Sequence, residues 1–382
     1  MAPVGIAILG SGIFAREAHL PAIATIGPSF VDLKAVYSRS EKSAAELARE
    51  AQSTLKLSSK PDVYFDADSS RNLDTLLARP DITAVIVVLP ITIQPSIVLK
   101  ALGAGKHVIS EKPVAPDVGS GLKLIAEYET KYKPKGLVWR VAENIETETG
   151  YHIAAKAIRD GKIGRVKIYN ARVVNYIDKN SKWYNTPWRT IPDYQGGFLL
   201  DGGVHTIAAL RVLLPSPIKT VSGFASLTKS YLAPHDTINA AVRSADGSHG
   251  LVELTWGAPT ASRSNLAFSG ITVTGADGWL SVNQVKVVDG SHPVEGIRTT
   301  VHIAKRDEDG RDLGEVEEIL DRTMDGVPKE LEGFVNAIRG DDNGLGNPQG
   351  ALKDVAFIQA GLNSNGRPVD IDVLMRSDVS SV

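Results

Sequence analysis

The fold is decided by the stretch VGIAILGSGIFA, which runs from Val4 to Ala15. Val4–Leu9 is uninterrupted and apolar, as in a strand buried on both faces of a parallel sheet. The next six residues match the pattern G-x-G-x-x-G/A, with Ala15 as the third small residue. In this pattern the glycines permit a tight turn and a close approach to a pyrophosphate, which the N-terminus of the next helix binds. We therefore expect four residues of this turn to bind a dinucleotide: Gly10, Gly12, Ile13 and Phe14.

The pattern around this stretch predicts two domains. Up to residue 143, short apolar runs alternate with stretches of helical spacing, which is typical of a doubly wound parallel sheet. Further on, longer strands with alternating faces flank Asp246-Gly247 and Asp277-Gly278, which predicts hairpins. We expect a Rossmann dinucleotide-binding domain at 1–143. For 144–382 we expect an α+β domain with a mostly antiparallel sheet.

Composition argues against several classes of protein. The 382 residues include no cysteine, which excludes disulfides, thiolate catalysis and cysteine-bound zinc. The eight histidines show no H-x-x-x-H pair, so we expect no metal site. With a net charge of −2 and no long basic run, a nucleic-acid partner is disfavoured. The longest apolar run, Ala84–Leu89, is far shorter than the roughly 20 residues of a membrane helix, and no N-terminal leader precedes the first strand. We expect a cytoplasmic protein without a membrane partner.

The end of the second predicted strand bears on the choice of cofactor. Proteins that bind NAD usually place a carboxylate there for the ribose 2′-hydroxyl. This chain has Ser38, followed by Arg39 and Lys42. A hydroxyl and a guanidinium suit a 2′-phosphate, which a carboxylate would repel. The pattern favours NADP(H) over NAD(H), with Ser38 and Arg39 as ligands; the alternative is that Arg39 is only a solvated loop cation.

Polar residues follow other strands of the first domain at the same edge of the sheet. In open α/β sheets, ligands bind outside the carboxyl ends of the strands. Pro113 disfavours helical geometry at Lys112 and permits a cis bond, which would hold this cation toward the ligand. The alternative is an ordinary surface lysine at a strand end. The residues expected to contact the cofactor at this edge are Leu89, Pro90, Gln94, Glu111, Lys112 and Asn144.

A second group of candidate residues lies in the larger domain. Asp201 and His205 are four residues apart, so on a helix they share a face, where the carboxylate would fix the imidazole tautomer for acid–base work. A purely structural hydrogen bond is an equal alternative. The neighbouring glycines indicate close approach to a ligand or to another chain segment. The preceding loop carries Trp183, Tyr184, Trp188 and Arg189, which would either contact the substrate or form a small local core.

Together these segments resemble the Gfo/Idh/MocA (glucose-fructose oxidoreductase, inositol dehydrogenase, rhizopine catabolism) family. The resemblance spans nearly the whole chain, through Gly10–Ala15, Glu111-Lys112-Pro113 and the segment from Gly197 to His205. It implies that Lys112, Asp201 and His205 occupy the family's catalytic positions. It also implies that the domain at 144–382 serves substrate binding and oligomerisation, with a large open sheet as the oligomer interface, hence a homodimer or homotetramer. Ile91, Gln94 and Ala208 depart from residues common in the family, which puts the substrate in doubt more than the chemistry.

These observations lead to one functional hypothesis and two alternatives. The hypothesis is an NADP(H)-dependent oxidoreductase that transfers a hydride between nicotinamide and a small sugar, polyol or related carbonyl or alcohol. His205, oriented by Asp201, would be the acid–base, and Lys112 would stabilise charge on the substrate oxygen or share the proton transfer. The alternatives are a reductase of a carbonyl or imine in secondary metabolism, and a non-catalytic dinucleotide-binding regulator.

Overall fold

The computed structural model describes residues 2–259, 269–289 and 292–377. Contacts between Cα atoms divide the chain into two compact units. The first unit comprises Met1–Thr147 and Gly326–Leu352, and the second comprises Glu148–Asp325 and Lys353–Val382. The first unit therefore takes in a late segment of the chain, at residues 326–352, in addition to its N-terminal part.

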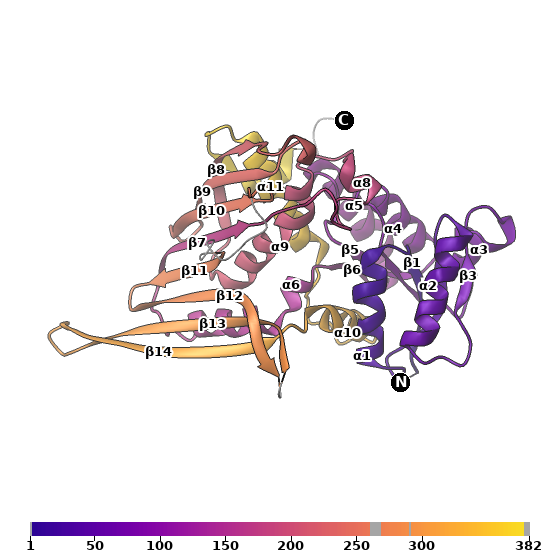
Figure 1. Ribbon diagram of the computed structural model, residues 1–382, viewed down its shortest axis with the longest axis horizontal. Helices are drawn as coiled ribbons and strands as arrows, with labels where there is room; N and C mark the ends of the chain where they lie inside the picture. The colour runs from indigo at the N-terminus through magenta and orange to yellow at the C-terminus, as the bar shows by residue number, and fades with distance from the viewer. Residues whose placement is uncertain (1, 260–268, 290–291, 378–382) are drawn as a thin grey trace. The chain divides into compact units, whose positions relative to one another are not determined.

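The first unit is built on a six-stranded, wholly parallel sheet (Figure 1). The strand order is β3-β2-β1-β4-β5-β6, so the direction of winding reverses between β1 and β4. This confirms the predicted doubly wound sheet and puts its switch point at the end of β1. The strands are β1 (Val4–Leu9), β2 (Val31–Tyr37), β3 (Asp62–Tyr64), β4 (Ala84–Val87), β5 (His107–Glu111) and β6 (Trp139–Ala142).

Helices cover this sheet because the strands are apolar on both faces. Ile6 and Ile8 of β1 are wholly buried and belong to one core cluster with Phe334 and Val335, which lie more than 300 positions later in the chain. The helix that carries these two residues thus completes the core of the first unit. The helices are α1 (Leu20–Ile26), α2 (Glu41–Thr54), α3 (Leu73–Leu77), α4 (Gln94–Gly103), α5 (Val118–Glu127), α6 (Asn144–Thr147) and α10 (Gly326–Ile338).

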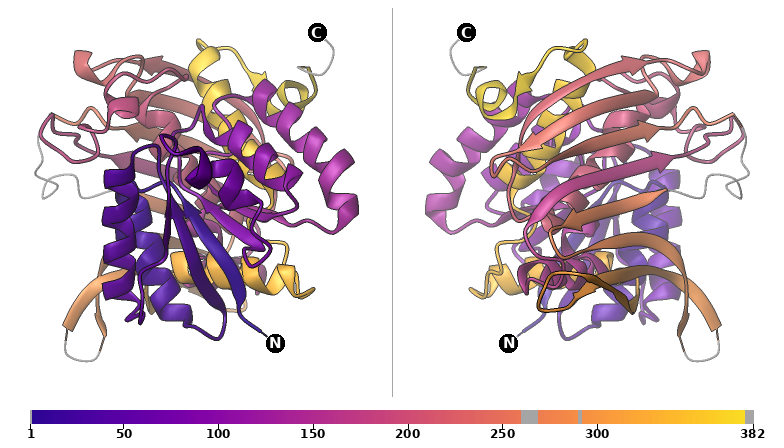
Figure 2. Two further views of the ribbon diagram at one scale, coloured as in Figure 1. Left: turned by 90° about the vertical axis from the view of Figure 1, so that its right-hand side faces the viewer. Right: turned by 90° about the vertical axis from the view of Figure 1, so that its left-hand side faces the viewer.

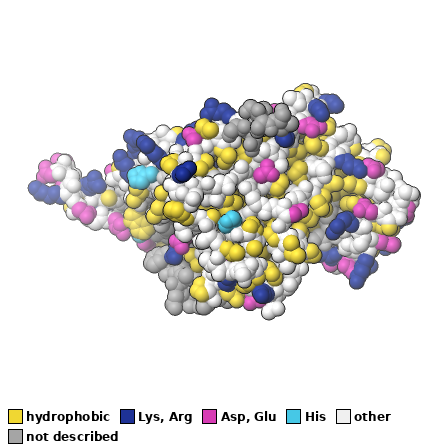
Figure 3. Space-filling model, turned by 90° about the horizontal axis from the view of Figure 1, so that it is seen from above, with side chains coloured by type: hydrophobic (Ala, Val, Ile, Leu, Met, Phe, Trp, Pro, Cys, Tyr) yellow, Lys and Arg dark blue, Asp and Glu magenta, His cyan; other side chains and the backbone are white. Residues whose placement is uncertain are grey.

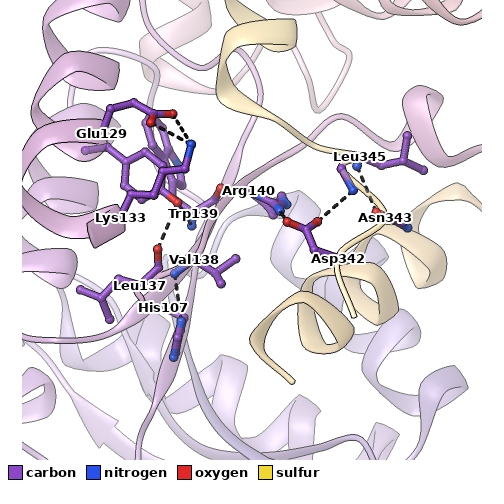
Figure 4. Close-up of polar contacts among 12 residues, drawn as sticks. His107, Glu129, Lys133, Leu137, Val138, Trp139, Arg140, Asp342, Asn343 and Leu345 are labelled. Carbon is purple, nitrogen blue, oxygen red and sulfur yellow. Dashed lines mark hydrogen bonds and ion pairs between the residues drawn. The ribbon is translucent and has the colours of Figure 1, made fainter. Parts of the chain in front are cut away.

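The segment after α10 is fastened to β6, as Figure 4 shows. Asp342 forms an ion pair with Arg140 of β6, and the amide of Val141 donates a hydrogen bond to the carbonyl of Gly346 at 2.8 Å. The guanidinium of Arg140 lowers the pKa of Asp342, so the carboxylate stays charged in this contact. Hydrogen bonding along the edge strand therefore explains why residues 339–346 group with the first unit.

The second unit contains a nine-stranded sheet in the order β14-β13-β12-β11-β7-β10-β9-β8-β15. β7 and β10 are parallel, and every other neighbouring pair is antiparallel. The two predicted hairpins are present, with Asp246-Gly247 between β9 and β10 and Asp277-Gly278 at the turn between β11 and β12. The strands are β7 (Val166–Val174), β8 (Ile218–Ser226), β9 (Thr237–Ser244), β10 (His249–Thr255), β11 (Gly270–Gly275), β12 (Gly278–Asp289), β13 (His292–Arg306), β14 (Asp312–Thr323) and β15 (Val369–Asp370).

Helices pack on one face of this sheet and leave the other face open, as the right-hand view of Figure 2 shows for the described residues. α7 (Thr149–Arg159) contacts β12, β13 and β14, whereas α9 (Phe198–Leu213) contacts β7 and β10. α11 (Pro348–Asn363) crosses from the first unit into the second, where Gly361 lies close to Ile238 of β9. Two short helices complete the described part of this unit, α8 (Pro187–Thr190) and α12 (Ile371–Ser377). The expected α+β domain with an open sheet is confirmed.

Candidate active site

The glycine turn after β1 is shaped by one close approach between main chains. Gly10 has a φ of +118°, and a Cβ atom added to it would lie 2.0 Å from the carbonyl oxygen of Val88. No side chain fits there. Gly12 differs, because an added Cβ would meet no described atom within 4 Å. The turn is therefore closed toward β4 and open at Gly12, as the approach of a pyrophosphate requires.

The helix that follows this turn contains a π-helical turn at Ala15–His19, after Ile13 and Phe14, which are half-buried. Such turns insert an extra residue and occur often at functional sites. Here the turn directs His19 inward, where its Nε2 lies 2.7 Å from Oε1 of Glu111. The Phe14 ring lies edge-on to the imidazole, with ring centroids 5.5 Å apart. Since Glu111 as a carboxylate only accepts hydrogen bonds, the proton of His19 lies on Nε2.

The buried contacts of Glu111 fix the position from which Lys112 extends. His19 holds its side chain, while Nε2 of Gln94 donates to its carbonyl oxygen and, at 3.2 Å, to that of Pro113. The Lys112–Pro113 peptide is cis, as the sequence permitted. Lys112 itself is half-buried. The side chains of Gln94 and Glu111 thus bind other groups of the protein, and these contacts fix the main chain on both sides of Lys112.

The remaining residues predicted at this edge follow the ends of β4 and β6. Leu89 and Pro90 come directly after β4 and are half-buried, and Leu89 lies beside the glycine turn. Asn144, also half-buried, begins α6 just beyond β6. The structure therefore places all the predicted cofactor residues at the carboxyl ends of the parallel strands.

Hydroxyl groups gather where β2 ends and α2 begins. Oγ of Ser11 donates to Oγ of Ser38 at 2.9 Å, and Ser38 is 3.0 Å from Oγ of Ser43. Ser40 caps α2 and bonds Ser43 at 2.6 Å. Arg39 is exposed beside this cluster. The sequence analysis missed Ser11 and Ser43; the spacing S-x-S-x-x-S from Ser38 to Ser43 was the signal that could have found Ser43, whereas no spacing marks Ser11.

Arg16 is another residue that the sequence analysis missed. Its Nε donates to the carbonyl of Ser11 at 2.9 Å, and its guanidinium forms ion pairs with Glu46 at 3.6 Å and with Glu50. The guanidinium thereby ties the glycine turn to α2. No sequence pattern marks this role, because Glu46 and Glu50 are helical neighbours of each other but distant from Arg16 along the chain.

In the second unit, α9 carries Asp201 and His205 on one face. The glycines between them serve packing, because an added Cβ at Gly202 would lie 2.4 Å from the Trp256 ring and one at Gly203 would lie 2.9 Å from Ile358. The sequence left open whether these glycines allow close approach of a ligand or of another chain segment. For both Gly202 and Gly203, the structure shows another chain segment. His205 is half-buried one helical turn after Asp201.

Arg189 connects the aromatic loop to Asp201. Its Nε donates to Oδ2 of Asp201 at 2.7 Å, and both side chains are nearly buried. The guanidinium also lies 4.1 Å from the centroid of Trp188 and 5.2 Å from that of Trp183, within cation–π range. Burial, followed by the charge of Asp201, raises the pKa of Tyr194 above its ordinary value, so this phenol stays protonated. The guanidinium of Arg189 thus contacts Asp201 and both tryptophan rings of the loop.

Tyr184 packs elsewhere, edge-on to Tyr231 with ring centroids 5.5 Å apart. All four residues predicted in this loop therefore make ordered contacts with the second unit's own side chains. Lys112 belongs to the first unit, while Asp201 and His205 belong to the second.

Other classes of site find little support in the part of the chain that the structure describes. There, no three His, Asp or Glu side chains gather as they would to hold a metal ion, and no helix is long and apolar enough to cross a membrane. On the face drawn in Figure 3, Lys and Arg side chains lie among Asp and Glu side chains rather than in one broad basic area.

Comparison with known proteins identifies the family. Residues 4–134 match the oxidoreductase family's NAD-binding Rossmann fold, and residues 155–371 match its C-terminal alpha/beta domain. The chain belongs to the Gfo/Idh/MocA oxidoreductase family. It is therefore an NAD(P)-dependent enzyme of the dehydrogenase and reductase class, and the glycine turn lies in its nucleotide-binding domain.

Its relatives include named enzymes. The dehydrogenase FPY6 of Fusarium mangiferae is 38% identical, over 94% of this chain and 96% of its own. A dTDP-3,4-didehydro-2,6-dideoxy-alpha-D-glucose 3-reductase of Streptomyces violaceoruber is 27% identical, over 90% of this chain and 88% of its own. Among solved structures, an oxidoreductase of Thermotoga maritima covers 97% of this chain and 99% of its own, at 28% identity and a TM-score of 0.79.

The two glycines of the turn should respond differently to substitution. Gly10→Ala should lower the free energy of unfolding by about 2–4 kcal/mol, because its Cβ meets a main-chain carbonyl at a strained φ. Gly12→Ala should leave unfolding within about 0.5 kcal/mol of the parent, since its Cβ enters open space, yet weaken dinucleotide binding. Urea unfolding and fluorescence titration with the dinucleotide measure both effects. Equal stability losses in the two variants would contradict this assignment.

Proposed function

We propose that the enzyme is an NADP(H)-dependent oxidoreductase that transfers a hydride between nicotinamide and a small sugar, polyol or related carbonyl or alcohol. The observation that carries the proposal is the bracing of Lys112. Two buried side chains, Glu111 and Gln94, hold the main chain around it at the carboxyl end of β5. β5 belongs to the same parallel sheet as the glycine turn, and ligands bind at that edge. A surface lysine with no role in binding or catalysis would not need its main chain held in this way.

The residues of this chain divide the work. A bound nicotinamide would supply or accept the hydride. The Lys112 ammonium would donate a hydrogen bond to the substrate oxygen and stabilise its negative charge during reduction. His205 would exchange the proton of that oxygen, with Lys112 sharing the transfer. Asp201, whose Oδ2 is held by Arg189, would orient His205 on their common helix face.

The aromatic loop supports a sugar or ring substrate. Trp183, Tyr184 and Trp188 offer flat apolar faces of the kind that stack on sugar rings. Arg189 is already paired with Asp201 and contacts the rings of Trp183 and Trp188. We propose that its guanidinium holds these two rings in place and also pairs with any acidic group of the substrate. The relative from Streptomyces violaceoruber, a reductase named for a dTDP-linked dideoxy sugar, is in keeping with a carbohydrate substrate.

The preference for NADP(H) is proposed from the hydroxyl cluster. The hydroxyls of Ser11 and Ser43 both lie within hydrogen-bonding distance of the Ser38 hydroxyl near the N-terminus of α2, beside the exposed Arg39. Hydroxyl donors, a helix N-terminus and a guanidinium together favour a dianionic 2′-phosphate over a neutral ribose hydroxyl.

The open face of the large sheet is proposed to join copies of the chain into a homodimer or homotetramer. Large apolar side chains stand on this face, including Leu251, which is 61% exposed, and Phe224, which is 64% exposed. The residues that pair with Leu251 in the neighbouring strands are Asn170 and Ala241, and Arg172 and Glu253 form an ion pair on the same face. An exposed apolar sheet face of this kind marks an interface. A cytoplasmic location is proposed from the composition.

Replacing Lys112 tests the proposed chemistry. Lys112→Ala should lower turnover by about 10²- to 10⁴-fold, the usual loss on removing an acid–base or charge-stabilising group, while the protein still binds the dinucleotide. Stopped-flow kinetics with a sugar and polyol panel gives turnover, and fluorescence titration gives binding. Lys123→Ala, at an exposed lysine of α5, is the matched control. Near-normal turnover of Lys112→Ala would refute the role of Lys112.

Cofactor choice should change when a carboxylate is placed at residue 38. The parent should use NADPH with the higher kcat/KM, and Ser38→Asp should lower the NADPH-to-NADH ratio by about tenfold or more through repulsion of the 2′-phosphate. Ser29→Asp, which adds the same charge at an exposed turn, should leave the ratio unchanged. The proposal fails if the parent prefers NADH.

A charge on the open sheet face should dissociate the oligomer. In Leu251→Asp, each copy would have to bury an unpaired carboxylate on association, so sedimentation equilibrium should show a lower mass than for the parent. Ile191→Asp alters another exposed apolar residue, in a loop, and should not change the mass. A monomeric parent, or an unchanged mass for Leu251→Asp, would rule out this interface.

A further inference from the structure

The second unit contains a pocket of about 200 Å³ that belongs to neither the nucleotide turn nor the aromatic loop. It is enclosed by the C-terminal half of α9, the segment Leu214–Pro217, the start of β8, α11 and α12. On α9 the lining residues Ile207, Leu210 and Arg211 share a face. Successive helical residues turn by about 100°, so His205 lies about 200° round the helix from Ile207. The pocket is therefore on the side of α9 away from His205.

The connection from α9 to β8 leaves this space. α9 ends at Leu213, and Pro215 and Pro217 prevent the helix from continuing. Because prolines carry no backbone N–H group, the segment from Leu214 to Pro217 presents few hydrogen-bond donors to the pocket. The apolar lining includes Leu214 and Ile218, which are half-buried, and Ile371, which is 5% exposed, whereas Leu210 and Phe357 are fully buried. An apolar cavity of about 150 Å³ suffices for one benzene molecule, so this pocket accommodates a six-membered ring.

Two ion pairs hold the walls of the pocket in place. Arg211 of α9 reaches Asp354 of α11 with two hydrogen bonds, from Nε at 3.1 Å and from Nη2 at 3.0 Å. Lys219 of β8 forms an ion pair with Asp372 of α12, and this contact lowers the pKa of the Asp372 carboxyl. The bidentate pair is the geometrically specific kind. Four separate elements are thus tied around a preformed space, which reduces the entropy cost of filling it.

The charge left over at the mouth is positive. The lining contains three cations and two carboxylates, and the carboxylates are paired with Arg211 and Lys219. Lys353 is the third cation; it is exposed and forms no hydrogen bond or ion pair among the described residues, and its charge contributes to the lowered pKa of the Asp372 carboxyl. An apolar floor with one available ammonium at its rim favours an apolar ligand that carries a single negative charge.

We propose that this pocket binds a small monocarboxylate with a ring or branched apolar body. The carboxylate pairs with Lys353 at the rim, and the apolar body lies on Leu214, Ile218 and Ile371. The volume of the pocket limits the apolar body of the ligand to about one ring. The single available cation, Lys353, favours a monoanion over a neutral compound or a dianion.

Binding is tested with the full-length protein and sodium 4-fluorobenzoate, followed by ¹⁹F NMR titration. The probe should show saturable broadening and shift, and 4-fluorobenzyl alcohol, which has nearly the same shape without the charge, should bind about tenfold more weakly or worse, as expected when one charge-assisted contact is lost. Lys353→Gln should weaken fluorobenzoate binding by a similar factor. Lys167→Gln, at an exposed lysine of β7, should bind like the parent.

A second variant addresses the pocket itself. Leu214→Trp places a large ring at the wall and should abolish binding of both probes, while circular dichroism shows a folded protein. The proposal is overturned if fluorobenzoate shows no saturable effect, if the alcohol binds equally well, or if Lys353→Gln leaves the affinity unchanged. If Leu214→Trp does not fold, the comparison of Lys353→Gln with Lys167→Gln still decides the question.

Discussion

The approach of Gly10 to the carbonyl of Val88 is the constraint on which the rest of the first unit depends. Because residue 10 lacks a side chain, the chain leaving β1 turns tightly over the end of β4. The helix after the turn then starts close to the sheet, and its π-helical turn brings His19 against Glu111 of β5. Glu111 in turn fixes the main chain beside Lys112. One missing Cβ atom thus leads, through the buried contact of His19 with Glu111, to the position of the proposed catalytic lysine.

Much of this arrangement was readable from the sequence because the signals were local. Continuous apolar runs such as Val4–Leu9 mark strands buried on both faces, and Asp-Gly pairs mark the hairpins at 246–247 and 277–278. The return of residues 326–352 to the first unit was not readable. It depends on Phe334 filling a core made by strands near the N-terminus and on Arg140 meeting Asp342, and neither contact leaves a periodic trace in the sequence.

The same distinction between local and long-range signals applies to the site residues. Ser38, Arg39, Lys112, Asp201 and His205 could be predicted because each occupies a fixed place in a local pattern. Ser11, Arg16 and His19 take part through partners far along the chain, so no spacing reveals them. For Gly202 and Gly203, by contrast, the local pattern was visible but its meaning was ambiguous. A glycine pattern beside candidate catalytic residues suggested two readings, and only Trp256 and Ile358, distant in sequence, decide for close packing.

The pair formed by Arg189 and Asp201 argues for a functional role of its surroundings. Two charges removed from water recover their desolvation cost only with good geometry, and apolar residues of similar volume usually stabilise a fold as well or better. Here one bond at 2.7 Å and two tryptophan rings compensate the cation, while Asp201 keeps a carboxylate on the face of α9 that also carries His205. Packing alone would be served by leucine at both positions. A carboxylate held in one orientation, one helical turn before an imidazole, is the arrangement that the proposed proton transfer at His205 requires, so the buried pair supports that proposal.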